Sequence, residues 1–260
     1  MRLKIGRGLG VAAVGAALAV SGLTQVAIGI PAQAAATRGA TYVPPRHDLY
    51  YGNKGAAVKS VQRRLNQLHY YAGPDDGVYG ADLEEAVWAF KEVQGLPMNA
   101  HSNSVITYAF RRALAQPKRP WVLIKHGPAT RIEINQKIEV LVLYRHHRPQ
   151  LILHVSTGGN CLIDQGCGWI TPDGNYTALS FDPGWVHVPL GEMYNPVFFI
   201  GTAYAIHGDI PVPWFPDSHG CVRIWMDAAA WFHHEVTVNP DGHGTHVYIR
   251  GTAPYSSLAN

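Results

Sequence analysis

The chain has 260 residues, 47% of them hydrophobic and 15% charged, with a formal net charge of +3. Three of its 21 basic residues lie within the first 34 positions, so the other 18 balance the 18 acidic residues. This near-neutral remainder lacks the basic excess typical of nucleic-acid-binding proteins, which argues against a nucleic-acid partner. It is long enough for two domains of moderate size.

Residues 1–34 have the pattern of a secretory signal peptide. A basic start (Arg2, Lys4 and Arg7) precedes an uncharged apolar run over residues 8–30, and residues 32–34 (AQA) fit a small-residue cleavage site. The alternative is an uncleaved membrane anchor, because the apolar run is longer than most signal cores. Its many Ala and Gly residues make it weakly hydrophobic and favour cleavage. We therefore expect an exported protein.

The next two segments are predicted to be a linker and a small helical domain. Residues 35–45 are small and polar and end in two prolines, which is typical of a linker. Residues 46–115 are expected to form three short helices. The first of these has one apolar face at helical spacing, made by Val58, Val61, Leu65 and Leu68.

The second helix of this domain is predicted to begin at Asp82. The Asp82 carboxylate would cap the helix, with Glu85 completing a capping-box pattern, and Gly95 would end it. The third helix is predicted over residues 104–114, with its apolar side chains inward. No catalytic constellation falls within these helices.

This block resembles the type 1 peptidoglycan-binding domain over residues 46–115. The residues that carry the resemblance are Gly52, Gly55, Val58, Val61, Gln62, Leu65, Leu68, Tyr70, Tyr71, Ala72, Gly73, Asp76, Gly77, Gly80, Ala86, Val87, Phe90, Gly95 and Leu96. The resemblance implies a three-helix all-α fold and a glycan or wall-polymer ligand. Asp82 stands where the family usually has Thr, and the stretch NAHSNSVIT lacks the usual Asp-Gly. A spacer domain that has lost its ligand is the alternative.

Residues 116–120 (QPKRP) are predicted to be a hinge, after which the sequence becomes typical of strands. The expected strands are Arg131–Asn135, Ile138–Tyr144, Leu151–Val155, Val197–Ile200, Ala203–Ile206 and His246–Arg250. One late helix is expected to begin near Asp227. We therefore predict a mostly β domain over residues 121–250, followed by a tail over 251–260.

The chain has three cysteines, so at least one stays unpaired in an oxidising compartment. Cys161 and Cys167 lie six positions apart in a Gly-rich loop and are predicted to form a disulfide, which leaves Cys221 as the free thiol. The alternative is that both loop cysteines stay reduced and only line a turn.

Cys221 stands in the stretch SHGCVR, fourteen residues after His207. A cysteine thiol attacks as the thiolate, and a neighbouring imidazole can produce it. Gly220 allows a tight turn beside the sulfur, and the loop 209–217, which has three prolines, is expected to be stiff and to exclude water. The alternative is that Cys221 is a small buried apolar residue.

Two other assignments of the same residues are open. His219 could be the base in place of His207. A zinc site built from His207, Asp209 and His219 would suit an exported protein, but no paired-ligand motif supports it.

Residues 121–250 resemble the L,D-transpeptidase catalytic domain of the YkuD type. The stretches that carry the resemblance are Val155–Gly159 (VSTGG), Thr171–Gly174 (TPDG), Ile206–Gly208 (IHG) and Ser218–Arg223 (SHGCVR). The resemblance implies that Cys221 is the nucleophile and that His207 accepts and donates its proton.

The resemblance also implies roles for the neighbours of these two residues. The backbone carbonyl of His219 would orient His207, and the amides of Gly220 and Cys221 would form the oxyanion hole. The remaining candidates for substrate contact are Ser218, Arg223, Gly208 and Tyr194. Arg223 could instead brace the loop, and an aromatic residue such as Tyr194 commonly belongs to the core of a β domain.

The function that the resemblance implies is a secreted cell-wall L,D-transpeptidase that needs no metal or organic cofactor. It would form an acyl-thioester with a peptidoglycan tetrapeptide stem, release D-Ala, and pass the acyl group to an amine of a neighbouring stem, giving 3-3 crosslinks. Carbapenem-type β-lactams would acylate the same thiol. The alternatives are an L,D-carboxypeptidase, with water as the acceptor, and a non-enzymatic wall-binding protein.

Overall fold

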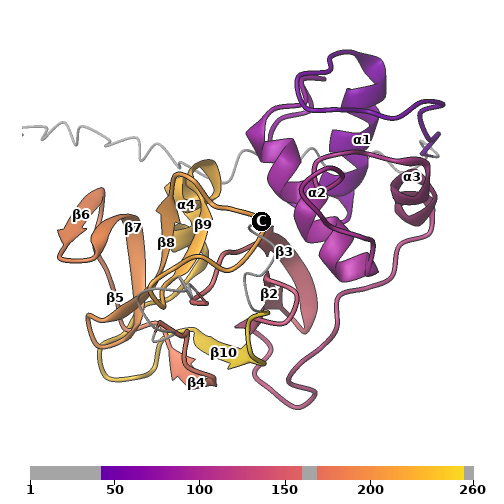
Figure 1. Cartoon of the computed structure of the whole chain (residues 1–260). Helices are drawn as coiled ribbons and strands as arrows, with labels where there is room; N and C mark the ends of the chain where they lie inside the picture. The colour runs from indigo at the N-terminus through magenta and orange to yellow at the C-terminus, as the bar shows by residue number, and fades with distance from the viewer. Residues whose placement is uncertain (1–41, 160–168, 255–260) are drawn as a thin grey trace, which may run out of the picture. The chain divides into compact units, whose positions relative to one another are not determined.

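A computed structural model describes residues 42–159 and 169–254 of the chain (Figure 1). The predicted signal peptide and the predicted Cys161–Cys167 disulfide lie outside these residues. Within the two described ranges, no helix combines the length and the hydropathy needed to cross a membrane.

From residue 42 onward, three helices precede the strands: α1 (Ala56–Gln67), α2 (Ala81–Gln94) and α3 (Tyr108–Ala115). Three residues of the predicted apolar face, Val58, Val61 and Leu65, lie in α1 and are each 0% exposed. The fourth, Leu68, is the C-cap of α1 and is partly buried against the same cluster. These side chains pack with residues of α2 and α3 in one hydrophobic cluster. The predicted helix order is therefore present.

Two helix starts differ from the prediction. The N-cap of α2 is Gly80, which offers no side-chain cap, so Asp82 and Glu85 do not form a capping box. The third helix begins four residues later than expected, after Thr107, whose hydroxyl oxygen accepts a hydrogen bond from the amide of Phe110. The preceding Ile106 instead pairs with Leu49 in an isolated β-bridge, because both residues are apolar and fully or nearly fully buried there.

In the described residues, ten strands form two sheets. The first sheet has the order β3-β2-β1-β10-β4 and consists of β1 (Arg131–Asn135), β2 (Val140–Arg145), β3 (Arg148–His154), β4 (Gly174–Thr177) and β10 (His246–Arg250). The second has the order β5-β7-β8-β9, with β6 paired to β7, and consists of β5 (Ser180–Phe181), β6 (Trp185–Val188), β7 (Gly191–Ile200), β8 (Tyr204–Asp209) and β9 (Val222–Trp225). A mostly β domain therefore follows the helices, as predicted.

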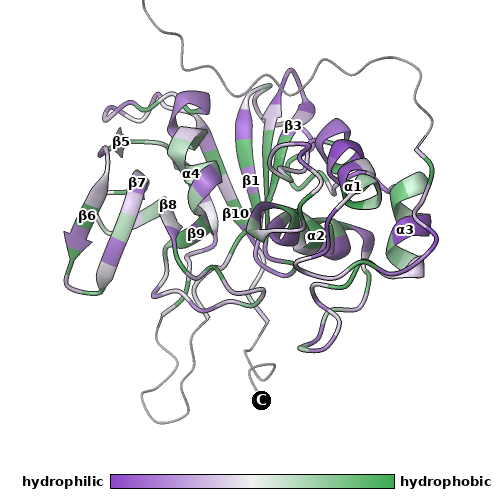
Figure 2. Ribbon diagram, turned by 90° about the horizontal axis from the view of Figure 1, so that it is seen from above, coloured by the Kyte–Doolittle hydropathy of each residue, from purple (hydrophilic) through white to green (hydrophobic). Residues whose placement is uncertain are grey.

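All six predicted strands are present, and four were missed. The bounds of β1 and β10 match the prediction, and Figure 2 shows the alternating hydrophobic and hydrophilic colours along β1. The missed strands are β4, β5, β6 and β9. The first three are short and partly exposed, so their sequences carry little apolar periodicity. By contrast, β9 has an alternating pattern (VRIW) that could have been recognised.

The strand β2 is buried on both faces, which explains its continuous apolar sequence. Leu141 and Leu143 face the core between the two sheets. Val140, Val142 and Tyr144 face the opposite way and share a cluster with the side chains of α1, α2 and α3. The backbone after α1 also joins the edge strand β3, where the amide of Ile152 donates to the carbonyl of His69 at 2.8 Å.

The second sheet supports the region of Cys221. Ile206 on β8 and Val222 on β9 are register partners and belong to the core between the sheets. The helix α4 (Met226–Phe232), which starts one residue before Asp227, near its predicted start, contributes four side chains to the same core. A short 3-10 helix, η1 (His233–Glu235), follows α4.

Replacing Ile152 with Ala tests the shared packing of helices and sheet. Ile152 is 1% exposed and belongs to the cluster that joins them, so the free energy of unfolding should fall by about 2–5 kcal/mol. Chemical denaturation followed by far-ultraviolet circular dichroism and by tryptophan fluorescence should give one coincident transition. Tyr108→Ala, at a 66% exposed position, is the control and should change stability by less than about 0.5 kcal/mol. Two separate transitions in the wild type would contradict the shared core.

Candidate active site

Cys221 and His207 lie on the same face of the second sheet. The strands β8 and β9 run parallel, and His207 is the register partner of Arg223. Because side chains alternate between faces along a strand, Cys221 shares the face of Arg223, and so of His207. A turn at residues 201–203 joins β7 to β8. His207 lies inside β8 and is held by both neighbouring strands, β7 and β9.

The Cys221 sulfur lies in a mostly apolar environment. Its side chain packs against Met193, Phe198 and Ala205, and its Sγ lies 3.8 Å from the carbonyl oxygen of Ala203, which can accept a hydrogen bond from the thiol. Burial raises the pKa of the Cys221 thiol above its ordinary value, against smaller opposing effects of the Ala205 amide and the Arg223 guanidinium. The resting thiol is therefore protonated at neutral pH.

His207 is 4% exposed, and its proton can be assigned from its hydrogen bond. Its Nδ1 lies 2.9 Å from the Gly208 carbonyl oxygen, which can only accept, so Nδ1 carries the proton. Burial lowers the pKa of the imidazole, against smaller opposing effects of the Gly208 carbonyl and Asp209. A neutral His207 thus keeps Nε2 free of a proton, as a general base requires.

The predicted orienting role of His219 is wrong, because the Gly208 carbonyl makes that contact. The His219 side chain is exposed, and its ring meets Trp169 edge-on with 5.3 Å between ring centroids. His219 therefore lies at the rim of the site, and the buried His207 is the better placed candidate for the base.

The turn before β9 is held by hydrogen bonds of Ser218. The Ser218 hydroxyl donates to the Cys221 carbonyl oxygen and accepts from the amide of Gly220 at 3.0 Å. Two predictions need correction in consequence. Ser218 is 1% exposed and shapes the turn rather than meeting a substrate. The Gly220 amide is already engaged, so of the two predicted oxyanion donors only the Cys221 amide remains a candidate.

Gly220 is required by its conformation and by its surroundings. Its φ is +116°, in the region that favours glycine, and a Cβ there would lie 2.6 Å from Cε1 of Tyr204. On the other side, the hydroxyl of Thr171 donates to the Gly220 carbonyl and accepts from the amide of Gly158, each at 2.8 Å. The turn is therefore fixed from both sides.

The segment that follows β3 is hydrogen-bonded to the turn before β9 and supports it. Ser156 exchanges two backbone hydrogen bonds with Arg223, and the amide of Ser218 donates to the Thr157 carbonyl. The Thr157 hydroxyl donates to the carboxyl group of Glu139 at 2.8 Å. Burial raises the pKa of Glu139 to about 8, against the hydrogen bonds from Thr157. The stretch VSTGG, which carries the family resemblance, thus holds the turn before Cys221 in place through hydrogen bonds.

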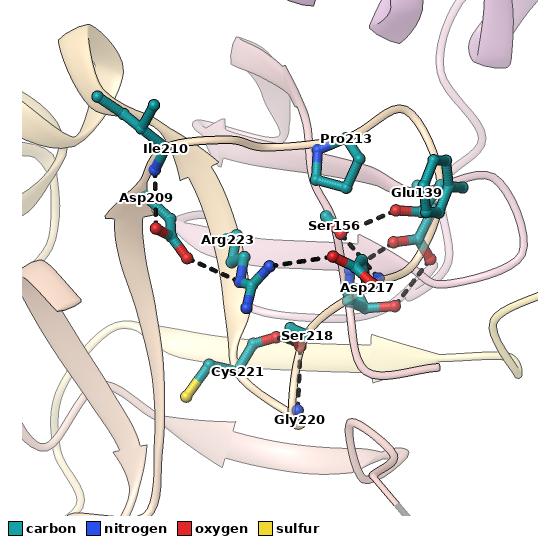
Figure 3. A network of polar contacts seen from close by, with 12 residues as sticks. Glu139, Ser156, Asp209, Ile210, Pro213, Asp217, Ser218, Gly220, Cys221 and Arg223 are labelled. Carbon is teal, nitrogen blue, oxygen red and sulfur yellow. Dashed lines mark hydrogen bonds and ion pairs between the residues drawn. The ribbon is translucent and has the colours of Figure 1, made fainter. Parts of the chain in front are cut away.

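Arg223 braces the loop between β8 and β9, one of its two predicted roles (Figure 3). Its Nε lies 2.8 Å from the carboxylate of Asp209, and its second guanidinium nitrogen lies 3.6 Å from the carboxylate of Asp217. These two aspartates stand at the two ends of the loop. The sequence suggested Asp209 only as an alternative zinc ligand and did not single out Asp217, although both lie at the ends of the Pro-rich loop.

Tyr194 and Gly208 do not contact the face of Cys221, contrary to the predicted substrate contacts. A Cβ on Gly208 would lie 2.7 Å from Cβ of Ala229 and 3.1 Å from the Tyr194 ring, so glycine is needed here for α4 to pack. Tyr194 itself packs against the core between the sheets. The apolar wall beside Cys221 comes instead from the hairpin β6–β7, through Val186 and Met193.

The alternative zinc site is not formed. Across residues 42–159 and 169–254, no three His, Cys, Asp or Glu side chains are grouped in a way that could hold a metal ion. Asp209 is engaged by Arg223, and the buried His207 and exposed His219 belong to different environments.

Comparison with known families agrees with this geometry. Residues 129–249 match the family described as the L,D-transpeptidase catalytic domain, YkuD. The β domain is an L,D-transpeptidase catalytic domain. Residues 54–100 match the family described as a putative peptidoglycan binding domain. That match covers α1 and α2 and ends before α3.

Solved structures of L,D-transpeptidases resemble the chain. The enzyme from Xylanimonas cellulosilytica (residues 123–326) is 28% identical, covers 80% of this chain and 100% of its own, and superimposes with a TM-score of 0.66. The L,D-transpeptidase from Stackebrandtia nassauensis is 15% identical, covers 82% of this chain and 99% of its own, and gives a TM-score of 0.47. No curated protein sequence matches the chain at a significant level.

Gly220→Ala should disable the L,D-transpeptidase site without unfolding the protein. The added Cβ would meet the Tyr204 ring at 2.6 Å in a backbone conformation unfavourable to alanine, at a cost of about 1–3 kcal/mol. We expect the rate of Cys221 alkylation by iodoacetamide, measured by peptide mass spectrometry, to change at least about tenfold. Gly95→Ala is the matched control, since Gly95 has φ +68° with no atom within 4 Å of the added Cβ. Equal alkylation rates in wild type and Gly220→Ala would contradict the role of the turn.

The pH dependence of Cys221 alkylation should report its raised pKa. Since burial lifts the pKa above its ordinary value of 9.0, the rate should climb by about tenfold per pH unit between about pH 7 and about pH 9. Arg223 lowers and Asp209 raises the pKa of the thiol. Arg223→Gln should therefore move the profile to higher pH, and Asp209→Asn should move it to lower pH. Both variants break the same ion pair, so a shift in one common direction would show that loop movement dominates over charge. A plateau below about pH 7 in the wild type would contradict the neutral thiol.

Proposed function

We propose that the chain is a secreted cell-wall L,D-transpeptidase that uses Cys221 as its nucleophile and His207 as its general base. The observation that carries the proposal is the pairing of a buried, neutral imidazole with a thiol on one face of the sheet. The Nδ1–H of His207 is fixed on the Gly208 carbonyl, so Nε2 is available to take a proton. The family match of residues 129–249 supplies the reaction class.

In the first half-reaction, Cys221 attacks the carbonyl carbon of the third residue of a tetrapeptide stem. His207 Nε2 accepts the thiol proton as the carbon–sulfur bond forms, and the carbonyl oxygen becomes an oxyanion. The Cys221 amide is the proposed donor to this oxyanion. The intermediate then collapses, the bond to D-Ala breaks, and its amine leaves with the proton from His207.

In the second half-reaction, the thioester passes to an amine on a neighbouring stem. His207 takes a proton from the attacking amine and returns it to the departing sulfur, which regenerates the thiol. The product is a crosslink between two third-position residues. Because the resting thiol and imidazole are both neutral, the proton moves during attack rather than before substrate binds.

The helical domain is proposed to hold the enzyme on peptidoglycan. The match of residues 54–100 to a peptidoglycan-binding family supports this assignment, as does the predicted export signal. Two neighbouring tyrosines, Tyr50 and Tyr51, are 53% and 56% exposed and could stack on sugar rings. Carbapenem-type β-lactams are proposed inhibitors, because a strained lactam carbonyl would acylate Cys221 in place of the stem.

Incubation with a purified disaccharide-tetrapeptide, followed by mass spectrometry, tests the proposed function. We expect a crosslinked dimer and free D-Ala from the wild type and neither from Cys221→Ala. His207→Ala should slow the reaction by about 10²- to 10⁴-fold, the usual contribution of a general base. His219→Ala is the matched control at the exposed histidine and should retain activity within about threefold of the wild type.

Each outcome of that experiment assigns a function. Loss of D-Ala without a dimer would replace the transferase by a carboxypeptidase that uses water. An unchanged substrate with both the wild type and Cys221→Ala would overturn the enzymatic proposal in favour of a wall-binding protein. A larger loss with His219→Ala than with His207→Ala would make His219 the base.

A further inference from the structure

His154 is a buried histidine outside the catalytic pair, and both of its ring nitrogens are engaged. It ends β3 and is 2% exposed. Its Nδ1 lies 2.9 Å from the carboxylate of Glu92, on the peptidoglycan-binding helix α2. Its Nε2 lies 3.0 Å from the carbonyl oxygen of Pro213, in the loop between β8 and β9. One side chain thus connects the helical domain to the loop beside the catalytic site.

The chemistry of these partners fixes a proton on Nε2. The Pro213 carbonyl can only accept, so Nε2 must donate to it. Burial opposes a charge on His154, but the Glu92 and Glu85 carboxylates outweigh it and raise the pKa of His154 to about 10. Burial also raises the pKa of Glu92 to about 7. Whether the shared proton lies on His154 or on Glu92, the hydrogen bond to Pro213 is retained.

The loop that receives this bond forms one side of the catalytic site. Its ends, Asp209 and Asp217, are the two aspartates bound by Arg223. Near its C-terminal end the Phe215 carbonyl accepts a hydrogen bond from the hydroxyl of Ser156 at 2.8 Å. In its middle, Pro213 is joined by His154. The prolines of the loop have no backbone N–H, so the loop has few donors of its own. Its carbonyls therefore accept hydrogen bonds from outside the loop, such as those from Ser156 and His154.

We propose that His154 is a positioning residue for acyl transfer, through which helix α2 of the peptidoglycan-binding domain holds the loop 209–217 against the catalytic turn. Glu92 orients the imidazole, Nε2–H holds the Pro213 carbonyl, and the loop in turn fixes Asp209 and Asp217 around Arg223. The helical domain is therefore part of the catalytic unit as well as a wall anchor. This inference rests on Cys221 and His207 as the proposed site of acyl transfer.

The test must separate positioning from simple stabilisation of the core. The double variant Glu92→Leu/His154→Phe replaces a buried ion pair by apolar side chains of similar size, which often leaves stability unchanged or raises it. It also removes the donor to Pro213. Glu92→Gln is the conservative variant, because a glutamine amide can still donate to Nδ1 and leave the proton on Nε2. Phe110→Leu perturbs a 0% exposed residue of α3 far in sequence from the loop and controls for lost stability.

Three measurements on the full-length protein decide the proposal: the thermal unfolding temperature, the rate of Cys221 alkylation by iodoacetamide, and kcat and KM with the tetrapeptide. We expect the double variant to be about as stable as the wild type. Its alkylation rate should change and its kcat/KM should fall, each by at least about tenfold, since small misplacements of a reacting group have effects of this size. Glu92→Gln should stay within about threefold of the wild type, and Phe110→Leu should lose stability but keep kcat/KM.

Wild-type kinetics in a folded double variant would overturn the proposal. If the double variant fails to fold, long-range ¹H–¹⁵N spectra of histidine-labelled wild type, assigned with His154→Gln, remain decisive. A proton on Nε2 of His154 is expected, and its absence would contradict the link to Pro213. The alkylation readout needs no peptidoglycan substrate, so an inactive wild type would count against the proposed function alone.

Discussion

The burial of β2 on both faces is the constraint on which the rest of the structure depends. One face, with Leu141 and Leu143, closes the core between the two sheets. The other, with Val142 and Tyr144, requires a second apolar cover, and the three helices provide it. Since a strand buried on both faces cannot lose either cover without exposing apolar surface, the peptidoglycan-binding helices are bound to the catalytic domain by the same force that folds it.

The catalytic centre depends on this packing through β3 and the segment that follows it. His154 ends the strand beneath α2, and Ser156 and Thr157 continue into the hydrogen bonds that hold the turn at Cys221. The imidazole of His207 is buried and the thiol of Cys221 is partly buried, and both groups are uncharged. The protein therefore supplies position and exclusion of water rather than a ready-made thiolate. Arg223 secures the loop through Asp209 and Asp217. Arg223 and Asp209 also influence the pKa values of both Cys221 and His207.

Cys221 and His207, the proposed nucleophile and base, could be singled out from the sequence, because a short motif contains them and the proposed chemistry requires those residue types. Roles that depend on the direction of a backbone amide or carbonyl could not be predicted from the sequence. The amide of Gly220 is engaged by Ser218, and the carbonyl that orients His207 belongs to Gly208, although the motif suggested His219. Tyr194 and Gly208 stand next to site residues in the sequence or in the sheet, yet the alternation of side chains places them on the opposite face.

The sequence by itself determined the order of the helices, the long strands, the mostly β second domain and its family, because these follow from apolar periodicity and short motifs. It also singled out Cys221, His207 and the Pro-rich loop. Only the tertiary structure decided that α2 reaches this loop through Glu92 and His154, which lie 62 residues apart in the chain. Such a contact leaves no local sequence pattern. Helix α2 and strand β3 each form from their own periodicity, and they come into contact only because β2 is buried on both faces.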